Sequence, residues 1–258
     1  MEQDRKIVIG HVKKNESISD QIFEMTIESE IESCSPGQFV NVYLDDKSML
    51  LPRPISICEH SGNTLTIVYR ISGKGTKCLS EYKAGSSVKI STPLGNGYQL
   101  EKNIAGKRVA LVAGGIGIPP MVELAKVLKE KRAEVNVFFG FASNPFLLDK
   151  IAGSSDFLSI ATEDGSSGFT GNIVDLVSQA ASFDEYYACG PKGMLRALST
   201  YVERVDRNVQ VSLEERMGCG YGACVGCACK IREGERVLYK SVCKHGPVFC
   251  GKDVVWDE

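Results

Sequence analysis

The chain has 258 residues, of which 43% are hydrophobic and 24% are charged, and its formal net charge is −2. This length can bury a substantial core in one large domain or in two to three small ones, and the balanced charge gives no electrostatic footprint for nucleic acid. No apolar stretch approaches the roughly 20 residues of a membrane span, and the first residues contain no apolar signal segment. We therefore expect a soluble, cytoplasmic protein without nucleic-acid or membrane partners.

Residues 1–100 show the alternation of polar and apolar side chains that is typical of β-strands. Turn residues separate such runs at 22–27, 40–44, 65–71 and 88–90. A series of short strands at this spacing predicts an antiparallel barrel or sandwich.

From residue 101 to residue 212 the pattern changes to strands that alternate with helices. Continuous apolar runs predict buried strands at 108–113, 135–139, 157–161 and 186–189. Helical spacing follows at 119–134, 173–181 and 191–205. This order predicts a parallel, doubly wound α/β sheet, which binds its ligands at the carboxyl ends of the strands.

The last stretch, residues 213–258, is rich in glycine and cysteine and has little regular period. It holds six of the ten cysteines, and three of these follow the spacing C-x4-C-x2-C. That spacing, with a fourth cysteine further along the chain, is typical of a plant-type [2Fe–2S] cluster. The candidate ligands are Cys219, Cys224, Cys227 and Cys243.

Two alternatives stay open for these cysteines. Cys229 or Cys250 could replace Cys243 as the fourth ligand, and a structural zinc ion would also take four thiolates. We favour the cluster because zinc sites prefer paired short spacings. The glycines between the cysteines also let the backbone fold around a cluster and point amides at its sulfurs.

Two glycine-rich turns each join a predicted strand to a predicted helix. The first turn contains Gly114, Gly115 and Gly117, and the second contains Cys189, Gly190 and Pro191. Small residues at such turns allow a dinucleotide to approach the strand end and the helix N-terminus. Either turn alone is equally consistent with tight packing, but two on one sheet predict a dinucleotide site at its carboxyl edge.

The first stretch contains two candidate phosphate-binding segments. Arg53-Pro54-Ile55-Ser56 offers a guanidinium suited to a pyrophosphate and a hydroxyl that could donate to a flavin ring edge. Further on, a predicted strand ends in a glycine turn with Gly75 and Thr76, whose amides could hold phosphate. The simpler interpretations are an extended edge segment and an ordinary hairpin turn.

The order of these features resembles that of the ferredoxin reductase superfamily, which joins an FAD-binding barrel to a nicotinamide-binding α/β domain. The position and spacing of the cysteine motif are further similar to those of the electron transfer subunits of dihydroorotate dehydrogenase B. The resemblance spans essentially the whole chain. It implies an FAD-binding β-barrel at 1–100, an NAD-binding domain at 101–212 and a small, irregular [2Fe–2S] domain at 213–258.

The resemblance also implies roles for particular residues. Arg53 would bind the FAD phosphates, and Ser56 would lie near flavin N5. The implied FAD contacts are Arg53, Pro54, Ile55, Ser56, Val68, Tyr69, Arg70, Ile71, Ser72, Gly75 and Thr76. The implied NAD contacts are Gly114, Gly115, Gly117, Cys189, Gly190 and Pro191. Many relatives have an aromatic residue between the Arg and the Ser, so Pro54-Ile55 leaves the stacking over the flavin ring unassigned.

The implied function is electron transfer within a larger enzyme. An FMN-containing catalytic subunit would oxidise dihydroorotate to orotate in pyrimidine biosynthesis. This chain would then pass the electrons through the cluster and FAD to NAD⁺, in a heterotetramer with two copies of each subunit. The chain has no pattern long enough for a (β/α)₈ barrel, so it is not expected to oxidise dihydroorotate alone.

Two other functions stay open at this point. One is the small subunit of an NAD(P)H-dependent ferredoxin or sulfide oxidoreductase with the same cofactors. The other is a zinc-stabilised binding or redox-sensing module. Residues 140–145 contain no Arg or Lys for a 2′-phosphate, which favours NAD over NADP.

Overall fold

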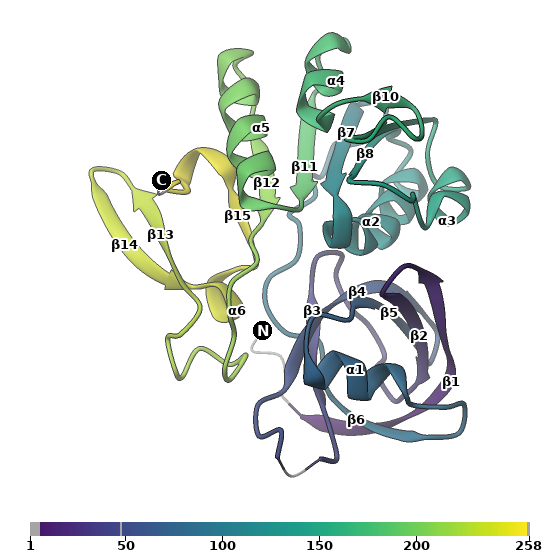
Figure 1. The fold of residues 1–258 in the computed structure, drawn as a ribbon. Coiled ribbons are helices and arrows are strands. Elements are labelled where there is room, and N and C mark those ends of the chain that lie inside the picture. The colour runs from purple at the N-terminus through teal and green to yellow at the C-terminus, as the bar shows by residue number, and fades with distance from the viewer. Residues whose placement is uncertain (1–5, 47, 257–258) are drawn as a thin grey trace.

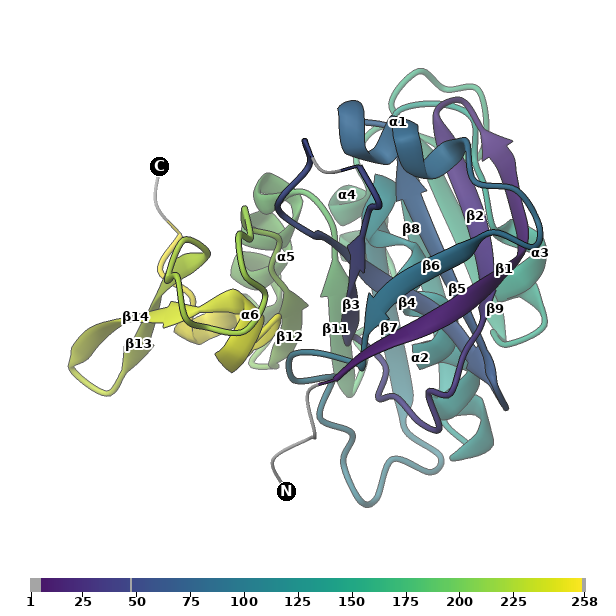
Figure 2. The same cartoon turned by 90° about the horizontal axis from the view of Figure 1, so that it is seen from below.

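The computed structural model describes residues 6–46 and 48–256, and the chain forms a barrel, an α/β domain and a small C-terminal part (Figures 1 and 2). Six antiparallel strands close the barrel in the order β1-β2-β5-β4-β3-β6. They are β1 (Ile7–Ser19), β2 (Ile22–Glu28), β3 (Phe39–Tyr43), β4 (Arg53–Ser61), β5 (Thr64–Arg70) and β6 (Ser87–Ser91). The antiparallel β-structure that the alternation predicts is thus confirmed as a closed barrel.

Alternation along the strands gives the barrel an inner and an outer face. Ile55 of β4 and Ile67 of β5 point inward and pack in the barrel core. Cys58 and Val68 point outward and belong to the hydrophobic core of the α/β domain. The outer face of β4 and β5 is therefore the side on which the barrel meets that domain.

Helix α1 (Lys74–Ser80) lies across one open end of the barrel (Figure 1). Its fully buried Leu79 packs into the barrel core and holds the helix there. The glycine turn at residues 73–76 starts this helix and does not connect two strands. The hairpin alternative for this turn is therefore wrong.

A seven-stranded sheet forms the α/β domain in the order β10-β9-β8-β7-β11-β12-β15. Its strands are β7 (Arg108–Gly114), β8 (Glu134–Phe141), β9 (Phe157–Thr162), β10 (Phe169–Thr170), β11 (Glu185–Cys189), β12 (Val209–Ser212) and β15 (Val248–Cys250). Only β15 is antiparallel to its neighbour.

Helices cover both faces of this sheet (Figure 1). One face carries α2 (Pro119–Glu130) and α3 (Leu148–Ala152), and the other carries α4 (Ile173–Gln179) and α5 (Lys192–Arg204). This is the doubly wound arrangement that the sequence predicts.

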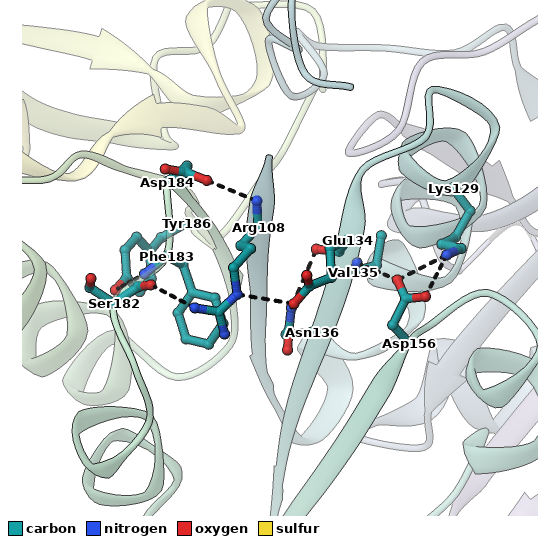
Figure 3. A network of polar contacts seen from close by, with 10 residues as sticks. All are labelled: Arg108, Lys129, Glu134, Val135, Asn136, Asp156, Ser182, Phe183, Asp184 and Tyr186. Atoms are coloured by element: carbon teal, nitrogen blue, oxygen red, sulfur yellow. Dashed lines mark hydrogen bonds and ion pairs between the residues drawn. The ribbon is translucent and has the colours of Figure 1, made fainter. Parts of the chain in front are cut away.

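Charged side chains tie together the amino ends of the sheet strands (Figure 3). Arg108 at the start of β7 donates to Glu134 at the start of β8 at 3.0 Å. Asp156, just before β9, binds Lys129 at 2.7 Å and accepts from the Val135 amide at 2.7 Å. These contacts hold the strand register at the edge opposite the glycine turns, so they position the candidate site without touching it.

The C-terminal part is regular mainly in a hairpin of β13 (Ala228–Glu233) and β14 (Arg236–Ser241), which projects from the rest of the molecule (Figure 2). The short helix α6 (Val242–His245) and the 3-10 helix η2 (Gly251–Asp253) flank β15. The three-part fold class is confirmed. The domain limits stay a prediction, and their outermost residues, 1–5 and 257–258, lie outside the described residues. Strand β15 comes from the third stretch of the sequence but completes the sheet of the second.

An ion-pair network joins the α/β domain to the barrel. Lys150 of α3 lies 3.0 Å from the Glu24 carboxylate of β2 and also pairs with Glu59 of β4. Glu24 is 7% exposed, so loss of Lys150 would leave a nearly buried carboxylate without its cation.

Replacing Lys150 with methionine, which keeps the apolar stem, is expected to lower the free energy of unfolding by about 1–2 kcal/mol at neutral pH. Burial lowers the pKa of Lys150, but hydrogen bonds to Glu59 and Glu24 outweigh burial and raise the pKa above its ordinary value. Between neutral pH and pH 10.5, the ordinary value, this stabilisation is therefore complete, and it is lost as the pH rises through the higher folded-state pKa.

Thermal unfolding of the variant and the wild type, at neutral pH and above pH 10.5, measures both effects. Lys89→Met is the control, because Lys89 pairs with Asp45 at an exposed site and is expected to change stability little. Equal unfolding temperatures for Lys150→Met and the wild type at neutral pH would contradict the role of this network.

Candidate functional site

Arg53 and Gly75 meet at the end of the barrel that α1 covers. A Cβ atom on Gly75 would overlap the Arg53 guanidinium, so a larger residue here would displace the guanidinium from its present place beside this turn. Arg53 also donates to the Leu51 carbonyl. The result is a fixed guanidinium beside the first turn of α1, an arrangement suited to a phosphate group.

The Thr76 side chain organises the same turn. Its hydroxyl oxygen accepts from the Ser72 amide at 2.9 Å and from the Gly73 amide at 3.3 Å. The hydroxyl also donates to the Gly73 carbonyl at 3.2 Å. Three hydrogen bonds of Thr76 thus shape the turn from β5 into α1, which contains the predicted FAD contacts Ile71, Ser72, Gly75 and Thr76.

The outer face of β4 and β5 offers a surface for a flavin ring between the barrel and the α/β domain. By alternation Pro54 and Ser56 lie on this face of β4, beside Arg70 on β5. Val68 lies on the same face, but its side chain is buried in the core of the α/β domain. The Arg70 guanidinium lies 3.6 Å from the position that a Cβ atom on Gly115 would take. The candidate flavin surface and the first glycine turn therefore border the same space.

Two of the predicted flavin contacts point away from this surface. Ile55 and Tyr69 pack in the barrel core. The Tyr69 hydroxyl donates to Asn15 at 2.9 Å, and its ring stacks on Phe23 with centroids 5.9 Å apart. The side chains of Ile55 and Tyr69 are therefore part of the barrel core and do not line the candidate flavin surface.

The two glycine turns pack directly against each other at the carboxyl ends of β7 and β11. A Cβ atom on Gly117 would overlap the Cys189–Gly190 peptide. A Cβ atom on Gly114 would lie 3.1 Å from the Pro191 ring, and one on Gly190 would lie 2.9 Å from the Gly114 nitrogen. The geometry accounts for the small residues by tight packing. It also places both turns at the carboxyl edge of the sheet, where dinucleotides bind in such folds, so their role in NAD binding stays a prediction.

Cys189 stands at the end of β11 beside these turns. Burial raises the pKa of its thiol to about 12. Because a thiol reacts as the thiolate, Cys189 stays protonated and unreactive at neutral pH. Its environment fits a packing role next to a ligand better than covalent chemistry.

The four predicted cluster cysteines come together as two pairs. The thiols of Cys219 and Cys224 are in hydrogen-bond contact. The Cys243 amide donates to the Cys227 sulfur at 3.5 Å, and these two thiols are also in contact. A [2Fe–2S] cluster takes four thiolates on two irons, so two pairs of cysteines match its donor set.

Backbone amides of the irregular loop at 217–227 donate hydrogen bonds to sulfur atoms of both pairs. The Tyr221 amide donates to the Cys219 sulfur at 3.3 Å, and the Gly222 amide donates to the Cys243 sulfur at 3.1 Å. Gly222 has φ +83°, a conformation that favours glycine. Hydrogen bonds to sulfur stabilise the thiolate form and tune a bound cluster.

The pKa values of these thiols follow from the same contacts. Burial alone would raise the pKa of Cys219, but amide hydrogen bonds from Cys224 and Tyr221 outweigh it and lower the pKa to about 6. Burial and contact with Cys227 raise the pKa of Cys243 to about 12. A metal ion deprotonates a coordinating thiol outright, so Cys243 fits a ligand that becomes a thiolate on metal binding.

The other two candidates for the fourth ligand lie in regular strands. Cys229 donates to the Lys240 carbonyl across the hairpin at 3.4 Å, and Cys250 pairs with Gln210 in the sheet. This geometry favours Cys243. Within residues 6–46 and 48–256, no three Cys, His, Asp or Glu side chains converge as ligands of one metal ion.

Strand β3, which the sequence predicts, makes contacts with the cysteine loop that the sequence does not predict. The Asn41 side-chain amide of β3 donates to the Cys219 carbonyl at 3.0 Å. The hydroxyl groups of Tyr43 and Tyr221 lie 2.8 Å apart. Alternation along 40–44 indicates that Asn41 and Tyr43 point out of the barrel, but nothing in the sequence indicates that the cysteine loop covers them.

The barrel, the doubly wound domain and the four-cysteine loop define an electron transfer protein of the ferredoxin reductase type. Residues 214–255 match the iron–sulfur cluster binding domain of dihydroorotate dehydrogenase B. The electron transfer subunit of dihydroorotate dehydrogenase B (NAD(+)) from Caldanaerobacter subterraneus subsp. tengcongensis is 39% identical over 248 residues, which cover 96% of this chain and 98% of that relative. The corresponding subunit from Bacillus caldolyticus is 43% identical, with 92% and 94% covered. This chain belongs to the family of dihydroorotate dehydrogenase B electron transfer subunits.

The fold is also similar to that of a solved NADH-dependent reduced ferredoxin-NADP oxidoreductase. The TM-score is 0.84 at 28% sequence identity, with 96% of this chain and 90% of that chain covered. Family and fold together make this protein an oxidoreductase subunit, and they support FAD, an iron–sulfur cluster and NAD as its cofactors. In the described part of the chain, every helix is too short or too polar to cross a membrane.

Proposed function

We propose that this chain receives electrons from the FMN of a dihydroorotate dehydrogenase catalytic subunit and delivers them to NAD⁺. Dihydroorotate is thereby oxidised to orotate in pyrimidine biosynthesis, in a cytoplasmic heterotetramer with two copies of each subunit. The names of the relatives support a partner catalytic subunit. Ten free cysteines also fit the reducing conditions of the cytoplasm.

Separate groups of residues in this chain hold each cofactor, with the flavin between the cluster and the nicotinamide. A bound FAD supplies the conversion between the single electrons of a cluster and the hydride exchange of a nicotinamide. Arg53 and the turn through Gly75 and Thr76 hold the FAD phosphates, and Ser56 and Arg70 border the flavin ring on the outer face of the barrel. The turns at residues 114–117 and 189–191 receive NAD.

The proposed cluster is a [2Fe–2S] cluster held by Cys219, Cys224, Cys227 and Cys243. The paired thiols and the amide hydrogen bonds to their sulfurs support this assignment. The proposed parts of the chain are residues 1–100 for FAD, 101–212 for NAD and 213–258 for the cluster.

One observation carries the proposal. The barrel contacts the cysteine loop through Asn41 and reaches the first glycine turn through Arg70. A carrier that exchanges electrons with both a cluster and a nicotinamide must lie between them, and the outer face of the barrel is the surface between these two contacts.

A second candidate function is the reduction or oxidation of a ferredoxin. The similarity to the NADH-dependent reduced ferredoxin-NADP oxidoreductase favours it. That relative is 28% identical, whereas the dihydroorotate dehydrogenase relatives are 39% and 43% identical, so we favour the dihydroorotate system.

The test is NADH formation from dihydroorotate by this chain, its catalytic subunit from the same organism, and their mixture. We expect NADH only from the mixture, because dihydroorotate is proposed to be oxidised on the FMN of the catalytic subunit. Formation of NADH with reduced ferredoxin, and none with the catalytic subunit, would contradict the proposal and favour the second candidate.

A further inference from the structure

Strand β3 of the barrel carries two contacts to the cysteine loop, and both come from its outer face. Asn41 donates to the Cys219 carbonyl at 3.0 Å, and the Tyr43 hydroxyl lies 2.8 Å from the Tyr221 hydroxyl. Their neighbours Val40 and Val42 point into the barrel core. The cysteine loop therefore lies against one strand of the barrel over two successive outward positions.

Asn41 is the more constrained of these two residues. It is 0% exposed, and its backbone amide donates to the Ser91 hydroxyl of β6 at 2.9 Å. A Cβ atom on Gly220 would overlap the Asn41 side-chain amide, so the loop backbone lies directly against this side chain. Its Oδ1 atom has no hydrogen-bond partner among the described residues. A buried oxygen without a hydrogen-bond partner lowers the stability of a fold, so a purely structural role does not account well for an asparagine here.

The pairing of β3 with β4 places Asn41 directly opposite Pro54, which belongs to the proposed FAD-binding segment 53–56. The backbone N–H of Asn41 points toward Ser91 on β6 and therefore away from β4. Asn41 and Pro54 thus face each other without hydrogen bonds between their backbones. Side chains are closest in such pairs. Asn41 therefore contacts a cluster ligand residue on one side and stands beside the flavin surface on the other.

We propose that Asn41 is a positioning residue that sets where Cys219, and with it the cluster, lies relative to the flavin. The amide hydrogen bond to the Cys219 carbonyl fixes the backbone of this ligand, and the contact between Tyr43 and Tyr221 supports the same loop. Asn41 thus controls electron passage between cluster and flavin without taking part in the chemistry. This inference rests on the proposed function, because it requires both cofactors in this chain.

Asn41→Leu, which keeps a similar volume but removes the hydrogen-bond donor, tests this role in the purified full chain. Stopped-flow mixing with NADH separates bleaching of the flavin from later bleaching of the cluster. Loss of a residue that supports a metal ligand costs about 10–100-fold, so cluster reduction is expected to slow by at least about tenfold. Flavin reduction is expected to keep its wild-type rate, and the midpoint potential and EPR signal of the cluster are expected to shift. Asn63→Leu, at an exposed turn of the same barrel, should change none of these.

A second readout uses protein from which the cluster has been removed. Release of the loop is expected to speed alkylation of Cys219 in Asn41→Leu, while the buried Cys227 reacts as in the wild type. Asn41→Ala provides the same test if leucine disturbs the packing. Equal rates, potentials and alkylation in these variants and the wild type would overturn the inference, as would an equal slowing of flavin and cluster reduction. A wild-type protein that carries no cluster would instead overturn the proposed function.

Discussion

Replacing Arg53 with methionine is expected to weaken FAD binding by at least about 30-fold. A hydrogen bond to a charged group contributes about 2 kcal/mol, which corresponds to this factor. Arg53 is the cation held beside the first turn of α1, so its loss removes the proposed partner of the FAD phosphates. Titration of flavin-free protein with FAD, followed by flavin fluorescence, measures the change.

Gly75→Ala is expected to weaken FAD binding in the same way, although it removes no charge. The added Cβ atom would overlap the Arg53 guanidinium and displace it. Gly73→Ala is the matched control, because Gly73 has φ 179°, an extended backbone, and a Cβ atom there meets nothing within 4 Å. Unchanged affinity in Arg53→Met, or equal losses in Gly73→Ala and Gly75→Ala, would contradict the phosphate site.

Replacing Cys243 with alanine is expected to abolish the long-wavelength absorbance of the cluster and nearly all bound iron. A [2Fe–2S] cluster needs four protein ligands, and the Cys243 sulfur is the one that contacts both Cys227 and the loop amide of Gly222. The flavin should remain bound and should still be reduced by NADH, because the barrel and the glycine turns are not altered.

Cys229→Ala and Cys250→Ala are the controls for the fourth ligand. Cys229 contacts Lys240 in the hairpin, and Cys250 lies in strand β15, so both variants are expected to keep full iron content. Iron and visible absorbance are measured after anaerobic purification. Retention of the cluster in Cys243→Ala, together with its loss in either control, would transfer the fourth position to that cysteine.

The larger elements of the fold could be predicted because apolar side chains recur with a different spacing in strands than in helices. Alternation at residues 65–71 can only place one set of side chains in a core, and the continuous apolar run at 108–113 indicates a strand covered on both faces. The cysteine motif could be recognised for a similar reason, since its spacing is fixed by the geometry of one cluster. Each of these patterns involves residues that are close together in the chain, so a single sequence is enough to reveal it.

The contacts between distant segments could not be predicted in this way. Alternation identifies Asn41 as outward-pointing, but its partner Cys219 is 178 positions away. Strand β15 has three residues and follows a cysteine-rich segment, so its place at the sheet edge depends on tertiary pairing alone. Tyr69 shows the same limit, because a residue implied near the flavin uses its side chain to fill the barrel core.

The visible spectrum of anaerobically purified protein, before and after addition of NADH, tests the central claim most directly. We expect a flavin band on top of a longer-wavelength iron–sulfur absorbance, and we expect both to bleach with NADH. That result means that one chain holds a nicotinamide site, a flavin and a cluster in electronic contact. A colourless protein, or a flavin band alone with zinc bound to the cysteines, would contradict the account.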